Sequence, residues 1–395
     1  MNVQRKTAGL AALALLIGLL VPLAVSADNP FVFGMLLVGP YNDRGWSQSH
    51  YEAGKYVEQK TGNARMLYID RVNPADRPGM TVPQLVDDLV EKGARLIIAN
   101  SDDMKDGVRQ AALSHPDIHF IHVSGDDVLT GKAPPNLTNL MGKMVYGKMM
   151  AGFSAAMTTR TGKIAYLGPL ENEETRRLAV ACYLGAKYAW ENVLKKAPDT
   201  LHFRVSWIGF WFHIPGVTAD PTAVAANFYD TGHDVIVSGL DTTEAVTVAR
   251  QKKAQGQTVW AMPYEYINAC QVGPDVCLGV PYFNWGPDYL KLVRQSMAGR
   301  WESRFIWSPP DWTDLDNPDT GAVGFKPGPA MPPKARTALD DFIARLAKGE
   351  VELFRGPLFY QDGSVFLKDG EIATDRQIWY VKKLLAGMSG TGGEK

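Results

Sequence analysis

The stretch that decides the fold is "FVFGMLLVGPYNDRGWSQSHYEAG", residues 31–54. Residues 31–39 form an apolar run, which is typical of a strand buried on both faces of a parallel sheet. A polar turn follows. Residues 47–60 then have the pattern of a helix, with Ser47 as candidate N-cap and Gly62 just past its end. The stretch therefore predicts a strand–turn–helix unit, which is the repeating element of α/β folds.

The same unit repeats along the chain in two series. The first series continues with strands at 65–70, 95–101 and 118–125 and helices at 81–93 and 104–114. After a helix at 142–158 the second series has strands at 163–168, 203–210, 234–240 and 258–263 and helices at 172–191, 221–231 and 242–255. Two consecutive series of similar length predict two lobes, each built on a parallel sheet.

Residues 1–27 are expected to be a signal peptide. Arg5 and Lys6 precede an apolar segment, and Val25-Ser26-Ala27 has the small residues of a cleavage site after Ala27. An uncleaved membrane anchor is the alternative, and Pro22 and the small residues favour cleavage. No cysteine lies near the site, so the acceptor for a lipid anchor is missing. We expect an exported, periplasmic protein.

The charge balance argues against a nucleic-acid partner. The chain has a net charge of −1, and loss of Arg5 and Lys6 with the leader changes this to −3, whereas nucleic-acid binding requires a basic face. We expect a monomer.

The three cysteines have different expected states. Cys270 and Cys277 lie in the turn-rich segment "NACQVGPDVC", where a disulfide and two unrelated thiols are about equally plausible. Cys182 falls on an apolar helical stripe and is expected to be a buried small hydrophobe. Residues 307–335 are rich in Pro, Asp and Gly, and are expected to be an ordered but irregular surface segment.

The carboxyl ends of the predicted strands carry aromatic and polar residues. In open α/β sheets these ends are where ligands bind. The candidates in the first half are Asn42, Trp46, Ser101, Asp102, Ser124 and Gly125, and those in the second half are Phe210, Trp211, Asp241 and Glu265. Two facing lobes could close their aromatic residues over a planar ligand and satisfy its edge with the polar groups.

Each candidate also has a purely structural alternative. Trp46 or Trp211 could pack in the core or between lobes. Asp102 and Asp241 could cap helices, Asn42 could serve the turn, and Glu265 could be a solvated charge.

Patterns for catalysis, cofactors and metals are scarce. The sequence has no GxSxG, P-loop, strand-borne GxGxxG or HExxH. His119 and His122 are three residues apart on a predicted strand, so their side chains point to opposite faces and a shared metal is not expected. We therefore assign no catalytic residue, no cofactor and no metal.

Five segments, in this order, resemble the basic membrane protein (BMP) family of ABC-importer substrate-binding proteins. They are "GPYNDRGWSQSHYEAG", "NLTNLMGKMVYGKMMAGFSAAMTTRTGKIAYLG", "DPTAVAANFYDTGHDVIVSGLDTTEAV", "FNWGPDYLKLVRQSMAGRW" and "GEVELFRGPLFYQDG". The resemblance runs from about residue 31 to the C-terminus.

The resemblance implies a type I periplasmic-binding fold, with two Rossmann-like lobes joined by three crossing segments near 126–141, 280–284 and 303–310. The N-terminal lobe would comprise 28–135 with 284–305, and the C-terminal lobe 136–283 with 306–395. The helix at 286–299 would return to the N-terminal lobe.

The resemblance also implies a ligand. The family's characterised ligands are purine nucleosides and bases, sandwiched by one aromatic residue from each lobe, and Trp46 and Trp211 fall at those positions. Asn284 is a further polar candidate. Nucleoside binders carry a lysine for the ribose where this chain has Phe283, and an acidic pair where it keeps only Glu265. This departure favours a free base or another flat heterocycle.

We therefore expect a non-enzymatic receptor that closes by hinge motion and docks on an ABC permease. Two alternatives stay open, an exported hydrolase of nucleosides or purines, and a subunit that presents its ligand to a signalling receptor.

Overall fold

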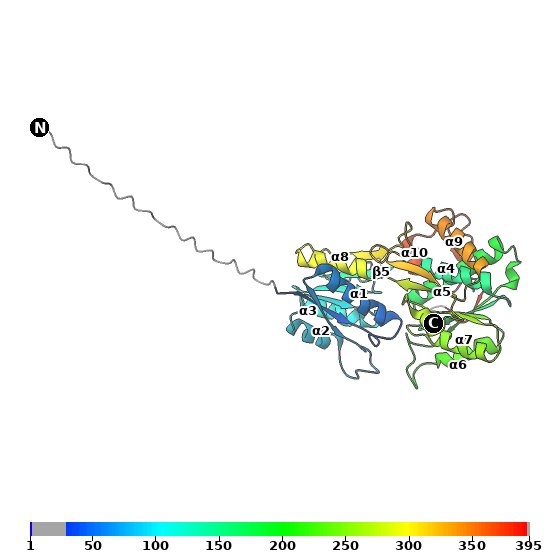
Figure 1. Cartoon of the computed structure of the whole chain (residues 1–395), viewed down its shortest axis with the longest axis horizontal. Coiled ribbons are helices and arrows are strands. Elements are labelled where there is room, and N and C mark those ends of the chain that lie inside the picture. Colours follow the sequence, from blue (N-terminus) through cyan, green and yellow to red (C-terminus); the bar gives the residue numbers. More distant parts are fainter. Residues whose placement is uncertain (2–28, 393–395) are drawn as a thin grey trace.

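The structure is a computed structural model that describes Met1 and residues 29–392, and it has two lobes side by side (Figure 1). The leader prediction for residues 1–27 lies almost wholly outside the described residues. Within residues 29–392, no helix combines the length and the apolar character that crossing a bilayer demands.

The first lobe is built on a six-stranded parallel sheet with the order β11-β5-β4-β3-β1-β2. Its strands are β1 (Phe31–Leu36), β2 (Ala64–Ile69), β3 (Leu96–Ala99), β4 (His119–Val123), β5 (Leu137–Gly142) and β11 (Phe305–Ser308). Its helices are α1 (Trp46–Thr61), α2 (Val82–Glu91), the short η1 (Asp102–Met104), α3 (Lys105–Ser114) and α8 (Gly286–Met297). The central strand β3 is buried along its whole length, as a sheet covered on both faces requires.

The second lobe has a five-stranded parallel sheet with the order β15-β7-β6-β8-β9. Its strands are β6 (Lys163–Gly168), β7 (His202–Trp207), β8 (Val235–Ser238), β9 (Trp260–Met262) and β15 (Met388–Ser389). Its helices are α4 (Val145–Thr158), α5 (Glu173–Tyr188), α6 (Pro221–Asp230), α7 (Glu244–Ala254), α9 (Pro333–Ala347) and α10 (Asp375–Trp379). Short helical turns lie at η2 (Ala189–Val193), η3 (Pro198–Thr200) and η4 (Ala269–Val272). The two predicted series of strands and helices are thus confirmed as two sheets.

The start of α1 differs from the prediction. Gly45 is the N-cap residue, and Ser47 lies inside the helix, where its hydroxyl accepts a hydrogen bond from the Gly39 amide. The orphan amides of the first turn are satisfied by the Asp43 carboxylate, which accepts from Gly45, Ser47 and Gln48. A carboxylate has enough acceptor sites for all three amides, whereas the Ser47 hydroxyl already accepts from the Gly39 amide. The predicted end at Gly62 is confirmed, in the left-handed conformation.

The segments that cross between the lobes extend beyond the predicted boundaries at 135 and 305. β5 and β11 pair with each other and complete the first sheet, so that sheet runs on to Gly142 and Ser308. The third crossing strand, β10 (Gly279–Phe283), pairs antiparallel with β12 (Val323–Pro327). The first sheet extends past residues 135 and 305 because β5 and β11 stay hydrogen-bonded to neighbouring strands beyond those positions.

β12 also corrects the expectation for residues 307–335. The Pro- and Asp-rich part is irregular, but Val323 and Phe325 are buried in the core. A hairpin of β13 (Leu358–Phe359) and β14 (Val365–Leu367) follows α9, with its turn at Asp362-Gly363.

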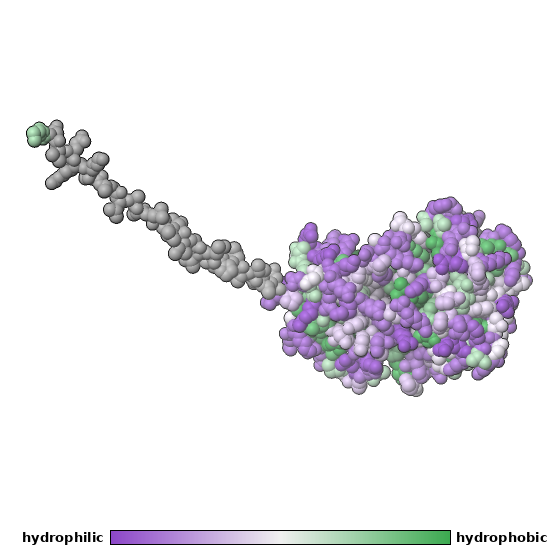
Figure 2. Space-filling view, viewed as in Figure 1, coloured by the Kyte–Doolittle hydropathy of each residue, from purple (hydrophilic) through white to green (hydrophobic). Residues whose placement is uncertain are grey.

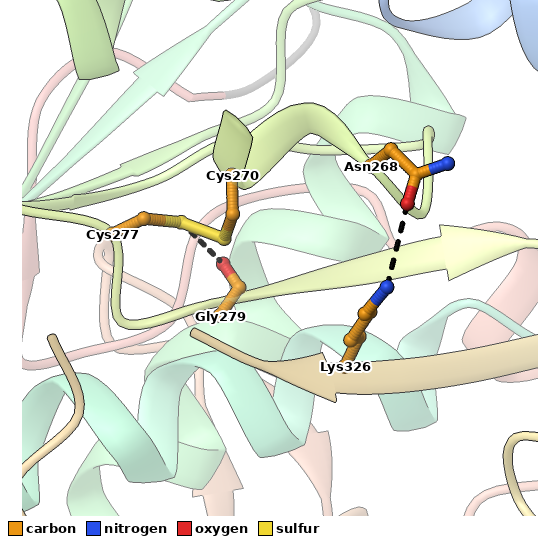
Figure 3. Close-up of a disulfide and its surroundings, with 5 residues drawn as sticks. All are labelled: Asn268, Cys270, Cys277, Gly279 and Lys326. Carbon is orange, nitrogen blue, oxygen red and sulfur yellow. Dashed lines mark hydrogen bonds between the residues drawn. A yellow bond between two sulfur atoms is a disulfide. The ribbon is translucent and has the colours of Figure 1, made fainter. Parts of the chain in front are cut away.

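A disulfide joins Cys270 and Cys277 beside the crossing strand β10 (Figure 3). The neighbouring Asn268 accepts a hydrogen bond from Lys326 of β12, so this loop is tied to both strands of the pair. Cys182 is buried on α5, as predicted.

The surface seen in Figure 2 is mainly hydrophilic, with hydrophobic residues in small separate groups. The large apolar residues belong to the core that the sheets and helices enclose.

α4 and α5 pack closely because glycines lie at their contact. A Cβ at Gly152 would lie 1.8 Å from the carbonyl oxygen of Cys182, and one at Gly185 would lie 2.0 Å from that of Met149. The contact matters for function, because α4 carries Lys148 and α5 carries Glu174 and Arg177, which are described below.

Gly185→Ala is expected to lower the free energy of unfolding by about 1–3 kcal/mol, because the added methyl forces two helix backbones apart. Urea denaturation measures the change. Lys187→Ala, at a partly exposed position on the same helix, is the control and should change stability by no more than about 0.5 kcal/mol. Equal stability of Gly185→Ala and wild type would contradict the close contact.

Candidate functional site

A small cavity lies where the carboxyl ends of strands from the two sheets face each other. It holds about 230 Å³ of empty space, of which about 10 Å³ can take the centre of a water molecule. Its walls are formed by Val38, Trp46, Asn100, Ser101, Asp102 and Ser124 from the first lobe and Glu174, Trp211, Asp241 and Glu265 from the second. The position is the one that open α/β sheets use for ligands.

Trp46 is fixed in the wall of the first lobe. Its indole N–H donates to the Asn100 carbonyl oxygen at 2.5 Å, and its ring meets His50, Phe283 and Trp285 edge-on. The side chain is only 5% exposed. Trp46 therefore packs in the core and also lines the cavity, and its role in stacking on a ligand stays a prediction.

Asn100 and Ser101 connect the strand ends of the first lobe. The Asn100 side-chain oxygen accepts from the Val38 amide, whereas its side-chain nitrogen has no hydrogen-bond partner. Ser101 caps η1 by accepting from the Asp103 amide. Since Ser101 supplies the cap, Asp102 is free of that role.

Two lining residues have backbone conformations that L-residues rarely adopt. Ser124 has φ +70° and Glu265 has φ +76°. The Glu265 backbone is held there by hydrogen bonds with β10, since its N–H donates to the Pro281 carbonyl and its own carbonyl accepts from Phe283. Such strain gathers at functional sites, where the surroundings hold the backbone in place.

The wall of the second lobe touches the first directly. The Trp211 indole N–H donates to the Asp103 carboxylate at 3.1 Å. The Asp241 amide donates to the Trp211 carbonyl, and a Cβ at Gly45 would lie 1.7 Å from the Asp241 carbonyl oxygen. The lobes are therefore in a closed arrangement. Asp241 is not a helix cap, because Thr243 is the N-cap residue of α7.

Glu174 reaches the cavity from the first turn of α5. This helix begins at a capping box, in which the Asn172 side chain accepts from Thr175. One Glu174 carboxyl oxygen, Oε2, is buried without a hydrogen-bond partner and lies 4.0 Å from the Arg177 guanidinium. Arg177 is itself buried, with its guanidinium 4.0 Å from the centre of the Trp379 ring.

Lys148 is a second buried cation, behind the cavity wall. Its ammonium group lies 3.4 Å from the centre of the Tyr264 ring and donates to the Ser238 carbonyl. Burial lowers its pKa from 10.5 to about 7. The nearby charge of Glu265 acts in the opposite direction.

The cavity wall is acidic. Asp102, Glu174, Asp241 and Glu265 line it, and no Lys, Arg or His side chain does so within the part of the chain that is described. Burial is the main cause that raises the pKa of all four carboxyls, and for Glu174 the value rises from 4.5 to about 7. For Asp241 and Glu265 neighbouring carboxylates add to the shift.

Seven of the candidates named from sequence line this cavity together, and four do not. The seven are Trp46, Ser101, Asp102, Ser124, Trp211, Asp241 and Glu265.

The other four lie elsewhere for identifiable reasons. Asn42 is exposed in the turn before α1. Gly125 packs against His122 and Asn139, and Phe210 packs edge-on against Phe212. Asn284 donates to backbone carbonyls of the 317–321 loop.

Three lining residues are additional to the predicted set, namely Val38, Asn100 and Glu174. Glu174 is the most informative of them. The strand that precedes it, β6, is central in its sheet, so the loop at its carboxyl end faces the cavity. Glu174 lies in the first turn of α5, directly after the loop that follows the carboxyl end of β6, and this position is the signal in the sequence.

The fold and the cavity between its lobes define a two-lobed solute-binding protein of the type I periplasmic-binding class. A profile of the Bmp family, described as "ABC transporter substrate-binding protein PnrA-like", matches residues 31–266. The chain belongs to this family. The family consists of solute-binding proteins, so the prediction of a binding protein rather than an enzyme is confirmed.

One relative and two solved structures are similar to this chain. A purine-binding protein of Brucella abortus is 27% identical over 368 residues, covering 92% of this chain and 95% of the relative. An ABC-transporter solute-binding protein from Conexibacter woesei superposes with a TM-score of 0.59 at 18% identity, covering 81% of this chain and 97% of that one. One from Aeropyrum pernix gives 0.63 at 10% identity, covering 81% and 92%. The structures support the fold.

Gly45→Ala is expected to prevent full closure of the lobes, because the new methyl would overlap the Asp241 carbonyl. Small-angle X-ray scattering should then show a larger radius of gyration than wild type, with unchanged helix content by circular dichroism. Gln48→Ala, one turn further along α1, is the control. A scattering curve of Gly45→Ala identical to wild type would contradict the contact.

Glu174→Gln is expected to make stability less dependent on pH. The raised pKa means that between about pH 4.5 and 7 the folded protein binds more protons at this group than the unfolded chain does. The group therefore lowers stability as pH rises, and the variant should gain relative to wild type by roughly 2–3 kcal/mol between pH 5 and 8. Urea unfolding measured across this range tests it.

Glu173→Gln, at an exposed carboxyl on the same helical turn, controls for the loss of a negative charge at the start of α5. If Glu174→Gln and wild type have parallel stability profiles, the assigned burial effect is wrong.

Proposed function

We propose that this protein is an exported receptor of an ABC importer, and that it binds a free purine base or related planar heterocycle between its lobes. The observation that carries the proposal is that Trp46 and Trp211, from opposite lobes, line one closed cavity. A flat ligand that enters this cavity would meet an indole from each lobe, and stacking of a base on an aromatic ring is worth about 1–3 kcal/mol.

One residue near the cavity supports a base without a sugar. Phe283, where nucleoside binders of the family carry a lysine, is stacked on Trp285 with ring centres 4.4 Å apart. The ring packs in the core and offers no hydrogen bond to a ribose.

Contacts across the cleft support closure by hinge motion. Trp211 of the second lobe donates to Asp103 of the first, and the Tyr266 hydroxyl donates to Glu52 of α1. These bonds form only when the lobes approach each other, and the crossing strands β5, β10 and β11 are the connections about which they would move. On this proposal the closed form is the one that a membrane permease recognises in the periplasm.

The similarity to the Brucella abortus purine-binding protein supports the ligand class. The alternative of an exported nucleoside or purine hydrolase has less support, because the family consists of solute-binding proteins.

Trp211→Ala is expected to weaken binding of a purine base about tenfold or more through lost stacking. Trp211→Phe cannot donate to Asp103, but it keeps a flat ring for stacking. This variant should therefore retain most of the affinity. Isothermal titration calorimetry on protein unfolded and refolded to remove bound ligand measures both.

Trp312→Ala, outside the cavity in the 309–322 loop, is the control and should bind as wild type does. Unchanged affinity in Trp211→Ala would rule out the stacking role.

A further inference from the structure

Glu174 is a buried carboxyl whose hydrogen-bonding capacity is not fully used within the protein. It is 8% exposed, and its Oε2 atom is buried without a hydrogen bond, with the Arg177 guanidinium 4.0 Å away and the Ser124 side chain beside the carboxyl. A buried polar atom left unpaired costs about 1–3 kcal/mol, so such atoms in folded proteins are normally satisfied. In this wall the missing partner would be a group that enters the cavity.

Open space adjoins the carboxyl on two sides. Glu174 lines the cavity between the lobes and also a neighbouring hollow of about 350 Å³ of empty space, and Asp102 and Ser124 are common to both. Glu174 therefore borders both spaces, the second of which is also lined by Arg177.

Arg177 fixes the carboxyl from behind. Its guanidinium is held between Glu174 and the Trp379 ring, and it donates to the Trp379 carbonyl. Arg177 is not among the residues that line the cavity between the lobes. It can position Glu174 and balance its charge, but the surface presented to a ligand there remains that of an acceptor.

The rest of the cavity wall is also acidic. Asp102, Asp241 and Glu265 also line the cavity, and Glu265 likewise has an unpaired Oε2 atom. A carboxylate only accepts hydrogen bonds, whereas a protonated carboxyl also donates one, and the Asn100 side-chain nitrogen is a donor in the lining without a partner. A ligand that complements Glu174 and Asn100 has an N–H donor at one position and an acceptor, such as a ring nitrogen, at another.

We propose that Glu174 is a specificity-determining residue that accepts a hydrogen bond from an amino group of the ligand, so that the cavity selects amino-substituted heterocycles over their oxo counterparts. An amino group offers two donors where an oxo group offers only an acceptor. An oxo group opposite a carboxylate would leave both oxygens unpaired and repelling each other. The inference rests on the proposed function and narrows its ligand class.

The test compares pairs of bases that differ at one substituent. Adenine and hypoxanthine differ in the amino or oxo group at C6, with N1 changing from an acceptor to an N–H donor, and guanine and xanthine differ in the same way at C2 and N3. Cytosine and uracil extend the comparison to pyrimidines. Calorimetry at pH 8, above the pKa of about 7 for Glu174, keeps this carboxyl in its acceptor form.

Wild type should bind the amino member of at least one pair about tenfold or more tightly than the oxo member, the range expected for a hydrogen bond to a charged group. Glu174→Gln should reduce that preference at least threefold while still binding the oxo member, which shows that the variant is folded. The matched control Glu173→Gln should keep the wild-type preference.

The failures of the two proposals are distinguishable. Equal affinity within every pair, tighter binding of the oxo member, or an undiminished preference in Glu174→Gln would overturn the role of Glu174 and leave the proposed function standing. Binding of no base by folded wild type would overturn both.

Discussion

The contact between Gly45 and the Asp241 carbonyl sets the geometry of the site. It is a backbone-to-backbone contact between the lobes, and no side chain other than hydrogen fits there. Asp241 in turn bonds to the Trp211 backbone, and Trp46 follows Gly45 directly. One close approach of two chain segments thus places both indoles and the Asp241 carboxyl on the same small volume.

The order of strands and helices could be predicted from the sequence because it depends on local pattern. The apolar runs 31–39 and 163–168 contain the buried strands β1 and β6, and seven candidates at strand ends line one cavity, since parallel strands end at a common edge. The disulfide between Cys270 and Cys277 could only be named as a possibility, because spacing does not set how far apart two cysteines lie.

What could not be predicted depends on orientation and long-range packing. Asn42 and Gly125 are next to strand ends but point away from the cavity or pack behind it, which no local pattern reveals. The sequence predicted Ser47 as the N-cap of α1, but the Asp43 carboxylate satisfies the free amides of the first turn. The turn brings this carboxylate to three of those amides. The sequence did not mark Glu174 as a site residue, because acidic residues in the first turn of a helix ordinarily interact with the helix dipole.

The electrostatics of the closed form link these features to the proposed function. Two buried cations, Lys148 and Arg177, support the walls from behind but do not line the cavity, while four carboxyls do. Burial raises the pKa of each of these carboxyls, which is the sign of a closed cavity whose acceptors lack donors. A ligand that supplies donors would relieve that cost only when both walls surround it. Closure would then be favoured by binding, because each lobe alone provides only part of the partners.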